Sequence, residues 1–289
     1  MNKITISYKS TSLLIEELKK QENIKVLKKR NLLSSLFSKK KYADVYFHTG
    51  ILDEKSIENI KNAKITITNS FDLMNKIIEK TKISQEKIKV IYPSINIEYK
   101  KTKDVKEKLC EELQIDLDTK LIFFTAKNFK LSGVKEFMDI CSSINYSNFK
   151  IIIAGEKKQI INLNFQISKY SNIQDRIILL ENYSNIDDLF LASDIFLLPT
   201  YNKSFSTNII KATYCKCVVF VSLDNDAKEI VDVFASMDSP TDQSIAFKID
   251  AILLNENDLK MIQKENRKLA LEFTLQSSLE KINQLIKNI

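Results

Sequence analysis

The sequence predicts an α/β protein built from two units, each a parallel sheet covered by helices. Short runs rich in β-branched residues alternate with amphipathic windows along almost the whole chain, which is the pattern of such sheets. Apolar runs such as Ile-Ile-Ile-Ala at 151–154 carry no polar alternation, as expected of strands buried on both faces. With 289 residues and 44% apolar content, the chain is long enough to bury two cores.

Residues 1–97 are predicted to form a small N-terminal domain. Runs rich in Ile, Val and Tyr predict strands, and amphipathic windows between most of them predict helices. The strands are expected at 3–8, 24–27, 44–48, 65–68 and 88–92, and the helices at 12–20, 54–63 and 71–80. The polar, lysine-rich segment 93–103 follows the last strand and is typical of a connector between domains.

Residues 98–272 contain a second, longer series of the same kind and are predicted to form the C-terminal domain. Strands are expected at 121–125, 149–154, 176–180, 194–198 and 218–222, and helices at 133–143, 186–192, 207–214 and 227–234. The tail from residue 256 onward is helical by pattern. Residues 273–289 are expected to form a closing helix that packs back on the N-terminal domain.

The composition excludes several kinds of chemistry. Only three glycines occur, so neither a Walker A loop nor a Gly-x-Gly-x-x-Gly nucleotide loop is present. His48 is the single histidine, which excludes histidine-rich metal sites. The four cysteines lack Cys-x-x-Cys spacing and are interpreted as reduced core thiols. We therefore expect no metal and no resident cofactor.

The chain begins without the basic head and long apolar stretch of a signal peptide, and no run reaches the length of a bilayer span. A cytoplasmic protein is the expectation. The net charge of +7 is uneven, because residues 1–97 hold 19 Lys and Arg against 10 Asp and Glu. The basic surface that faces a partner is therefore predicted in the first third of the chain.

Residues 27–42 set four large apolar side chains between two basic clusters. These are Leu32, Leu33, Leu36 and Phe37. This arrangement is typical of a helix lying on an anionic membrane, and it would place the protein at the inner face of the membrane, beside a lipid-linked acceptor. The alternative is a solvated loop whose leucines close over the small domain. Nucleic acid is not an expected partner, because no nucleic-acid-binding module is recognisable.

Ligands of open α/β sheets bind beyond the carboxyl ends of the strands, so the loops there are the candidate site. Four loops stand out, at 126–133, 155–158, 181–183 and 199–207. The first supplies Lys127 and Lys130 before a helix whose N-terminus favours an anion. The fourth is rich in hydroxyl groups, and Thr207 is its predicted helix N-cap.

The order of these segments resembles the C-terminal donor domain of family 4 glycosyltransferases (glycosyl transferases group 1), which have the GT-B fold. The resemblance is carried by 176–231, by the interdomain segment 87–96, by the loop-containing segment 121–137 and by the closing helices at 267–286. Within 176–231 the residues in register are Ala192, Asp194, Pro199, Phe205, Ala212, Cys215, Val219, Glu229, Ile230 and Val231. The resemblance implies a GT-B-like protein with two Rossmann-like domains, an acceptor-side domain and a donor-binding domain.

The resemblance also implies a function and a set of site residues. The expected function is transfer of a sugar from a nucleotide-sugar donor to a glycan or lipid-linked acceptor, as in surface polysaccharide or lipopolysaccharide synthesis, without a metal. Phosphate is expected at Lys127, Ser132 and Gly133, the base beside Asn182 and Tyr183, and the sugar and ribose beside Lys203, Ser204, Phe205, Ser206, Thr207 and Lys211. His48 matches the place of an active-site histidine in the family; the plainer interpretation is a structural residue at a strand end.

Three departures from the family pattern leave the activity open. Lys203 and Lys211 stand where the family has two glutamates that contact the donor, and Ser132 stands where it has a phosphate-binding lysine. Replacing carboxylates by ammonium groups removes hydrogen-bond acceptors for sugar hydroxyls and reverses the charge. Two alternatives follow: a catalytically silent paralogue that serves as a binding or assembly module, and an enzyme retuned to an acidic or phosphorylated ligand.

Overall fold

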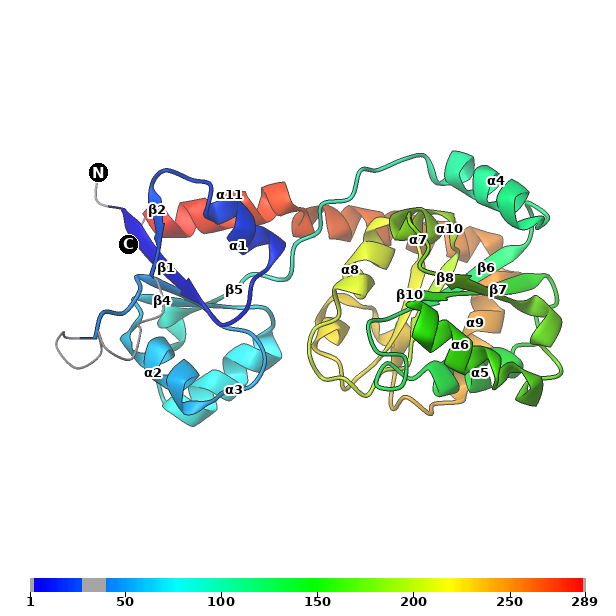
Figure 1. The fold of residues 1–289 in the computed structure, drawn as a ribbon, viewed down its shortest axis with the longest axis horizontal. Helices are drawn as coiled ribbons and strands as arrows, with labels where there is room; N and C mark the ends of the chain where they lie inside the picture. The colour runs from blue at the N-terminus through cyan, green and yellow to red at the C-terminus, as the bar shows by residue number, and fades with distance from the viewer. Residues whose placement is uncertain (1–2, 28–39, 288–289) are drawn as a thin grey trace. The chain divides into compact units, whose positions relative to one another are not determined.

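The computed structural model describes residues 3–27 and 40–287, and its contacts divide the chain into two compact units (Figure 1). Unit 1 comprises residues 1–96 together with 272–289, and unit 2 comprises residues 97–271. Each unit contains one fully parallel sheet with helices on both faces. No helix within 3–27 and 40–287 is long and apolar enough to cross a bilayer.

The sheet of unit 1 has the strand order β2-β1-β3-β4-β5. The strands are β1 (Ile4–Tyr8), β2 (Ile24–Val26), β3 (Val45–Phe47), β4 (Ile65–Thr68) and β5 (Ile88–Val90). The helices are α1 (Leu13–Leu18), α2 (Glu54–Asn62), α3 (Phe71–Thr81) and, from the end of the chain, α11 (Leu275–Lys287). Starting at β1, the order runs one way to β2 and the other way to β3, so a topological switch point lies between β1 and β3.

The two faces of this sheet bury separate clusters of side chains. Ile6 and Leu14 lie in one cluster with Ile282 and Ile286 of α11. The opposite face packs Tyr46 against α2 and α3. Polar side chains begin the helices: Ser12, Asp53 and Ser70 accept hydrogen bonds from the third helical amides of α1, α2 and α3.

The sheet of unit 2 has the order β11-β10-β9-β6-β7-β8, with its switch point between β6 and β9. The strands are β6 (Lys120–Thr125), β7 (Phe149–Gly155), β8 (Ile177–Glu181), β9 (Ile195–Leu198), β10 (Val218–Ser222) and β11 (Ser236–Met237). The helices are α4 (Thr102–Leu113), α5 (Val134–Ser142), α6 (Lys157–Asn164), α7 (Ile186–Ala192), α8 (Thr207–Tyr214), α9 (Ser244–Leu254) and α10 (Glu256–Ala270). Fully buried phenylalanines, among them Phe123, Phe190 and Phe196, fill the core in mutual ring contact.

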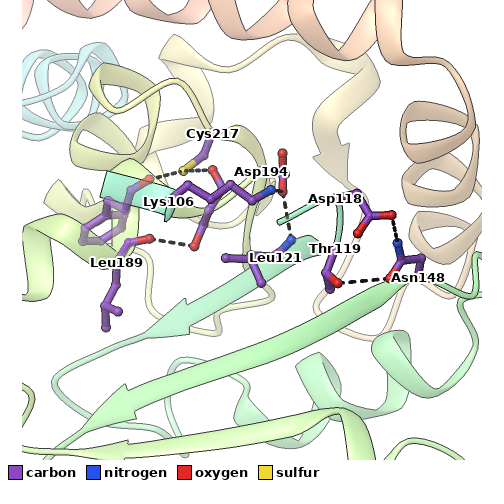
Figure 2. Close-up of polar contacts among 10 residues, drawn as sticks. Lys106, Asp118, Thr119, Leu121, Asn148, Leu189, Asp194 and Cys217 are labelled. Atoms are coloured by element: carbon purple, nitrogen blue, oxygen red, sulfur yellow. Dashed lines mark hydrogen bonds and ion pairs between the residues drawn. The ribbon is translucent and has the colours of Figure 1, made fainter. Parts of the chain in front are cut away.

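Asp194 fixes the amino ends of the central strands of unit 2 (Figure 2). Its carboxylate accepts hydrogen bonds from the Leu121 amide and the Lys106 ammonium, both at 2.9 Å, and these three residues come from β6, α4 and the start of β9. Asp194 is 9% exposed, so this pair is largely removed from water. The contact sets β6 against β9 and therefore aligns the loops at their opposite, carboxyl ends.

Arg267 of α10 lies between two tyrosine rings. Its guanidinium carbon is 3.9 Å from the Tyr99 ring centre and 3.5 Å from that of Tyr214, and it donates a 2.8 Å hydrogen bond to the Tyr214 carbonyl. Arg176 lies in a similar way over Phe149, at 4.7 Å. Stacking of a planar cation on aromatic faces stabilises such contacts.

The ten predicted strands are present, and most of the predicted helices form within a residue or two. The helix predicted at 227–234 is wrong, because the chain there makes two short 3-10 turns, Asp226–Ile230 and Val233–Ala235. Asn225 and Asp232 cap these turns by accepting from the amides two residues on, which favours separate turns over one helix. The helices α4, α6 and α9 were not expected from the sequence, and α4 begins inside the predicted connector 93–103.

Candidate functional site

The loops after β6 and β9 flank the switch point of unit 2 and are joined to each other. The Leu131 carbonyl accepts hydrogen bonds from the Tyr201 amide at 3.0 Å and from the Thr200 hydroxyl at 3.2 Å. Two of the four loops predicted from the sequence are therefore one continuous surface. This is where ligands of doubly wound sheets bind.

Gly133 is required by this close approach. A Cβ atom on Gly133 would lie 1.7 Å from the Pro199 carbonyl oxygen, and its φ of +76° favours glycine in any case. Gly133 also begins α5 as its N-cap and offers no side chain to the first helical amides. No side chain caps the N-terminus of α5, whose first amide, that of Val134, donates to the Phe129 carbonyl at 3.0 Å, and the helix dipole favours an anionic ligand here.

Lys127 and Ser132 lie in the loop after β6, on either side of its turn. Lys127 is exposed and has no ion-pair partner in the described parts of the chain, while Ser132 is half-buried. Gln159 of α6 holds this loop, since its side chain accepts from the Phe129 amide at 2.6 Å and donates to the Lys127 carbonyl at 3.2 Å. The sequence analysis did not identify Gln159, because the contact joins segments 30 residues apart.

Asn225 organises the loop that contains Lys203, Ser204 and Ser206. Its amide donates to the carbonyls of Asn202 and Ser204, both at 2.7 Å, and its oxygen accepts from the Ser206 amide at 3.1 Å. Asn225 is 1% exposed. Phe205 is buried beneath the same loop. The position of the loop is thus set by a residue that the sequence analysis missed.

The predicted N-cap Thr207 is wrong. Ser206 is the N-cap of α8, and Thr207 is its first residue and is exposed. Ser206 makes no side-chain capping bond, and its backbone amide donates to the Asn225 side-chain oxygen. The N-terminus of α8 thus has no side-chain cap either, and the side-chain amide of Asn208 donates to the carbonyl of Thr125, the last residue of β6, at 3.0 Å.

Lys203 and Lys211, which replace the family's glutamates, have different surroundings. The Lys211 ammonium is 2.7 Å from a carboxylate oxygen of Asp187 in α7, and both side chains are about one-third exposed. Lys203 is exposed, with no ion-pair partner among the described residues. One introduced charge is therefore neutralised within the chain, and the other is presented to solvent.

Asn182 and Tyr183 lie in the loop after β8, and each contacts a residue of a helix. Asn182 adopts a positive φ of 47°, and its side-chain oxygen lies 3.4 Å from the Lys157 amide at the start of α6. The Tyr183 hydroxyl donates to Glu112 of α4 at 3.1 Å. Burial, followed by this hydrogen bond to Glu112, raises the pKa of Tyr183 to about 12. A base-contacting role for either residue stays a prediction.

A pocket of about 610 Å³ adjoins the loop after β6 on its outer side, between α5 and α6. Its apolar lining includes Phe129, Leu131 and Leu163, with Tyr201 at the rim. Lys127, Ser132 and Lys203 are not among the lining residues. Residues 128–131 of the predicted phosphate loop, including the charged Lys130, therefore line the pocket.

His48 lies in unit 1, directly after β3. It is completely buried, and neither ring nitrogen has a hydrogen-bond partner among the residues that the structure describes. Burial, and secondarily the nearby Lys9 ammonium, lower the pKa of His48 to about 4. The ring is therefore neutral at pH 7.

No group of three or more His, Cys, Asp or Glu side chains within the described segments could hold a metal ion. All four cysteines are buried free thiols. Burial raises the pKa of Cys215 to about 12, so its thiol stays protonated. The Cys217 thiol donates to the Phe190 carbonyl at 3.1 Å and serves the packing of the sheet.

The chain thus folds into two parallel α/β units, and the candidate site lies in the loops at the switch point of the second. The family model "Glycosyl transferases group 1" matches residues 105–269, which is more than half of the chain. The chain belongs to this family. No curated protein matches it.

Solved structures with the same architecture are GT-B glycosyltransferases. The protein HepE of Anabaena, solved in complex with UDP and glucose, is 19% identical, with a TM-score of 0.71 over 85% of this chain and 71% of that one. WaaG, described as a glycosyltransferase involved in lipopolysaccharide biosynthesis, is 12% identical, with a TM-score of 0.69 over 98% of both chains. A glycosyltransferase of Rickettsia africae is 19% identical, with a TM-score of 0.69 over 84% of this chain and 70% of that one. The predicted GT-B-like fold class is confirmed.

Proposed function

We propose that the protein transfers a sugar from a nucleotide-sugar donor to a glycan or lipid-linked acceptor. The observation that carries the proposal is the joined pair of loops at the switch point of unit 2, which contain the exposed Lys127 and lead into α5 and α8, two helices without a side-chain N-cap. Membership of the glycosyl transferases group 1 family supports it. The HepE structures, solved with UDP and with UDP-glucose, support a nucleotide-sugar donor.

The chemistry of the proposed site is electrostatic. Transfer of the sugar leaves negative charge on the departing diphosphate, and that charge needs fixed positive groups in a preorganised position. Lys127 supplies an ammonium, and the two helix N-termini, which no side chain caps, supply the positive ends of the helix dipoles. Gln159 and Asn225 hold the two loops in place, so that these groups need little rearrangement when the donor binds.

The acceptor is proposed to reach the protein at a membrane. The basic, leucine-containing segment 27–42 is the sequence feature that supports this, and its residues 28–39 lie outside the described structure. A peripheral position at the inner face of the membrane would bring a lipid-linked acceptor to the enzyme. WaaG, which shares the fold, is named for a part in lipopolysaccharide biosynthesis.

Calorimetric titration with UDP, GDP and CMP tests the donor site. We expect one nucleoside diphosphate to bind, and Lys127→Ala to weaken it by roughly 1.5–3 kcal/mol, the range for a charge-assisted hydrogen bond. Lys157→Ala is the matched control, because Lys157 is also exposed near a helix start but faces Glu181 at 3.4 Å. Equal losses of affinity in the two variants would contradict the assignment of the loop after β6 as the phosphate-binding loop. If no nucleotide binds at millimolar concentration, a catalytically silent module is favoured.

A second candidate function is supported by the two lysines. Lys203 is an exposed cation at the proposed sugar position, which favours an acidic or phosphorylated donor over a neutral one. Comparing UDP-glucuronic acid with UDP-glucose tests this: tighter binding of the acidic sugar, abolished by Lys203→Gln, is the expected result. Equal affinity for both sugars would remove this candidate.

Restoring glutamate at positions 203 and 211 distinguishes an enzyme whose donor site has changed at these two residues alone from a catalytically silent module. We expect the double variant Lys203→Glu, Lys211→Glu to show no strong transfer from common UDP-sugars. The Lys211→Glu change replaces the partner of Asp187 by a second carboxylate, and two like charges at this distance disfavour the ionised pair. Ser132 also remains without the family's ammonium. Robust turnover by the double variant, measured as UDP release, would contradict this.

A further inference from the structure

Helix α9 of unit 2 has two apolar sides, and only one of them is buried. The buried side, which includes Ile245, Ile249 and Leu253, packs on the core. Phe247 and Leu254 lie seven positions apart, on the opposite side of the helix, and are 69% and 74% exposed. The outer side of a surface helix ordinarily carries polar residues. The outer side of α9 therefore lacks what a helix in contact with water alone requires.

The exposed apolar surface continues from α9 onto the 3-10 turn Val233–Ala235, which packs beside it. Val233 and Phe234 are both exposed. The Lys248 ammonium of α9 lies 5.6 Å from the centre of the Phe234 ring, which joins the turn to the helix. We refer to the four exposed apolar side chains Val233, Phe234, Phe247 and Leu254 as the α9 face.

The α9 face is carried by a helix that polar contacts fix in position. The buried Asp250 carboxylate accepts hydrogen bonds from the Asn145 and Tyr146 amides, at 3.0 and 2.8 Å. Just before the helix, the Asp242 side chain accepts from the Ser244 amide at 3.0 Å. A surface that is already ordered loses little conformational entropy when a partner binds to it.

The surroundings of the α9 face are acidic, although the chain as a whole is basic. Residues 223–258 contain nine Asp and Glu against two Lys, a net charge of −7 within a chain whose net charge is +7. Glu256 is paired with Lys260 at 3.1 Å. Asp232 and Asp238 are exposed and have no ion-pair partner among the residues that the structure describes. Exposed apolar side chains and unpaired carboxylates thus lie in the same segment.

This charge distinguishes between the occupants that an exposed apolar face can have. An anionic membrane would attract basic surroundings and repels acidic ones. A second copy of the chain, placed symmetrically on the same face, would bring two acidic surfaces together. A basic partner is attracted, and an amphipathic helix is the element whose apolar side covers such a face.

We propose that the α9 face is a docking site for a basic amphipathic helix of a partner protein. The apolar side of that helix covers Phe247 and Leu254, and its lysines or arginines face Asp232 and Asp238. No residue of the α9 face belongs to the loops after β6 and β9. The proposal is therefore independent of nucleotide binding and of sugar transfer.

The chain contains no tryptophan, so the burial of a tryptophan in a probe can be measured directly. The probe is a synthetic amphipathic helix of leucine and lysine with one tryptophan among its leucines. With the full-length protein, we expect its emission to shift to shorter wavelength in a saturable way at micromolar concentration, and added salt to weaken binding. A peptide of the same composition with its leucines spread around the helix should bind at least about tenfold more weakly.

Two pairs of substitutions separate the apolar and the charged contributions. Phe247→Gln with Leu254→Gln removes the apolar contacts but keeps good helix formers, and should weaken binding by at least about tenfold. Phe165→Gln is the matched control, because Phe165 is 77% exposed at the end of α6, outside the acidic segment, and it should change nothing. Asp232→Asn with Asp238→Asn should weaken binding and reduce its dependence on salt.

Three outcomes would overturn the proposal. The first is equal affinity of the peptide for the unmodified protein and for the variant with glutamine at positions 247 and 254. The second is a dimer in sedimentation equilibrium that the same variant abolishes, because a second copy would then cover the face. The third is loss of sedimentation with anionic liposomes in that variant, which would make a membrane the occupant.

Discussion

Gly133 illustrates how a single residue constrains the candidate donor site. The chain has only three glycines, and two of them, Gly133 and Gly155, stand where another segment approaches the backbone too closely for a side chain. At Gly133 that segment is the Pro199 carbonyl, and at Gly155 it is the Phe129 ring. The sequence showed that glycine was scarce, but the neighbours that exclude a Cβ atom come from distant segments and could not be predicted.

Gly133→Ala is expected to lower the stability of unit 2 by about 2–4 kcal/mol, since it combines left-handed strain with a clash against backbone. Gly50→Ala is the matched control. Gly50 has nearly the same φ, +75°, but open space around it, so roughly 1 kcal/mol is expected. Urea denaturation followed by circular dichroism measures both. Similar losses in the two variants would show that the approach to Pro199 is not tight.

His48 gives a pH dependence with a definite sign. Because burial lowers its pKa to about 4, from an ordinary value near 6.5, the unfolded chain binds a proton between these pH values and the folded chain does not. Stability is therefore complete above pH 6.5 and falls as the pH drops toward 4, by about 3 kcal/mol. Unfolding free energies at three pH values spanning this interval check this. His48→Phe should reduce the change in unfolding free energy between pH 6.5 and 4. An unchanged slope of that free energy against pH would contradict the assignment of this change to His48.

At the scale of elements, strands were predicted from the sequence better than helices. Buried strands such as β7 and β9 are continuous apolar runs, and that signal is local. The helices α6 and α9 lack such a signal: α6 begins among charged residues, and α9 is apolar on nearly every side. α9 also carries Asp250, whose buried carboxylate accepts from the Asn145 and Tyr146 amides, a contact spanning more than 100 residues.

The distinction between local and long-range signals also decides which parts of the candidate site could be predicted from the sequence. The positions of the loops follow from strand ends, so the sequence was sufficient to predict them. Gln159 and Asn225, which hold the loops, and Asp187, which pairs with Lys211, come from other segments of the chain, so no local pattern predicts their contacts. The only available signal was for Asn225, which lies in an Asp-Asn-Asp run after a buried strand, where turn residues are expected.

The contact of Asp194 with β6 is expected to be a main source of order at the amino edge of unit 2. Asp194→Asn keeps an acceptor for the Leu121 amide but leaves the mostly buried Lys106 ammonium without its counter-charge. A loss of roughly 1.5–3 kcal/mol is expected, the range for hydrogen bonds to charged groups. Lys106→Met should relieve part of this loss in the double variant, because the unpaired charge disappears. Strictly additive losses, measured by urea denaturation, would contradict the pair.

Across the whole molecule, charge is concentrated in the part of the chain that forms unit 1. The basic clusters around residues 28–30 and 39–41 contribute six of its positive charges, and of these Lys40 and Lys41 lie within the described structure, where Lys40 pairs with Glu58. The remainder of the chain is nearly neutral. The charge distribution therefore predicts that any association with an acidic surface involves unit 1.

Sedimentation with anionic liposomes at low salt, and release as the salt concentration rises, is the expected outcome. Each basic residue near such a surface contributes about 1 kcal/mol, and salt screens the attraction. Neutralising Lys28, Lys29, Arg30, Lys39, Lys40 and Lys41 should abolish the association. The control neutralises six exposed lysines of unit 2, Lys103, Lys108, Lys135, Lys158, Lys169 and Lys260. Unchanged sedimentation of the first variant would mean that 27–42 is a solvated loop.

The stacked arginines have a consequence for how this sequence tolerates change. The chain has 44 basic residues, and only three of them are arginine, so lysine stands almost everywhere that a positive charge alone is sufficient. Arg176 and Arg267 are the two arginines within the described structure, and each places its guanidinium over an aromatic ring and donates to a backbone carbonyl. A lysine has no planar guanidinium with which to make this pair of contacts. Arg176 and Arg267 therefore mark positions where the shape of the cation matters more than its charge. Replacing either by lysine would lower the stability of unit 2, whereas exchanging arginine and lysine at an exposed position would not.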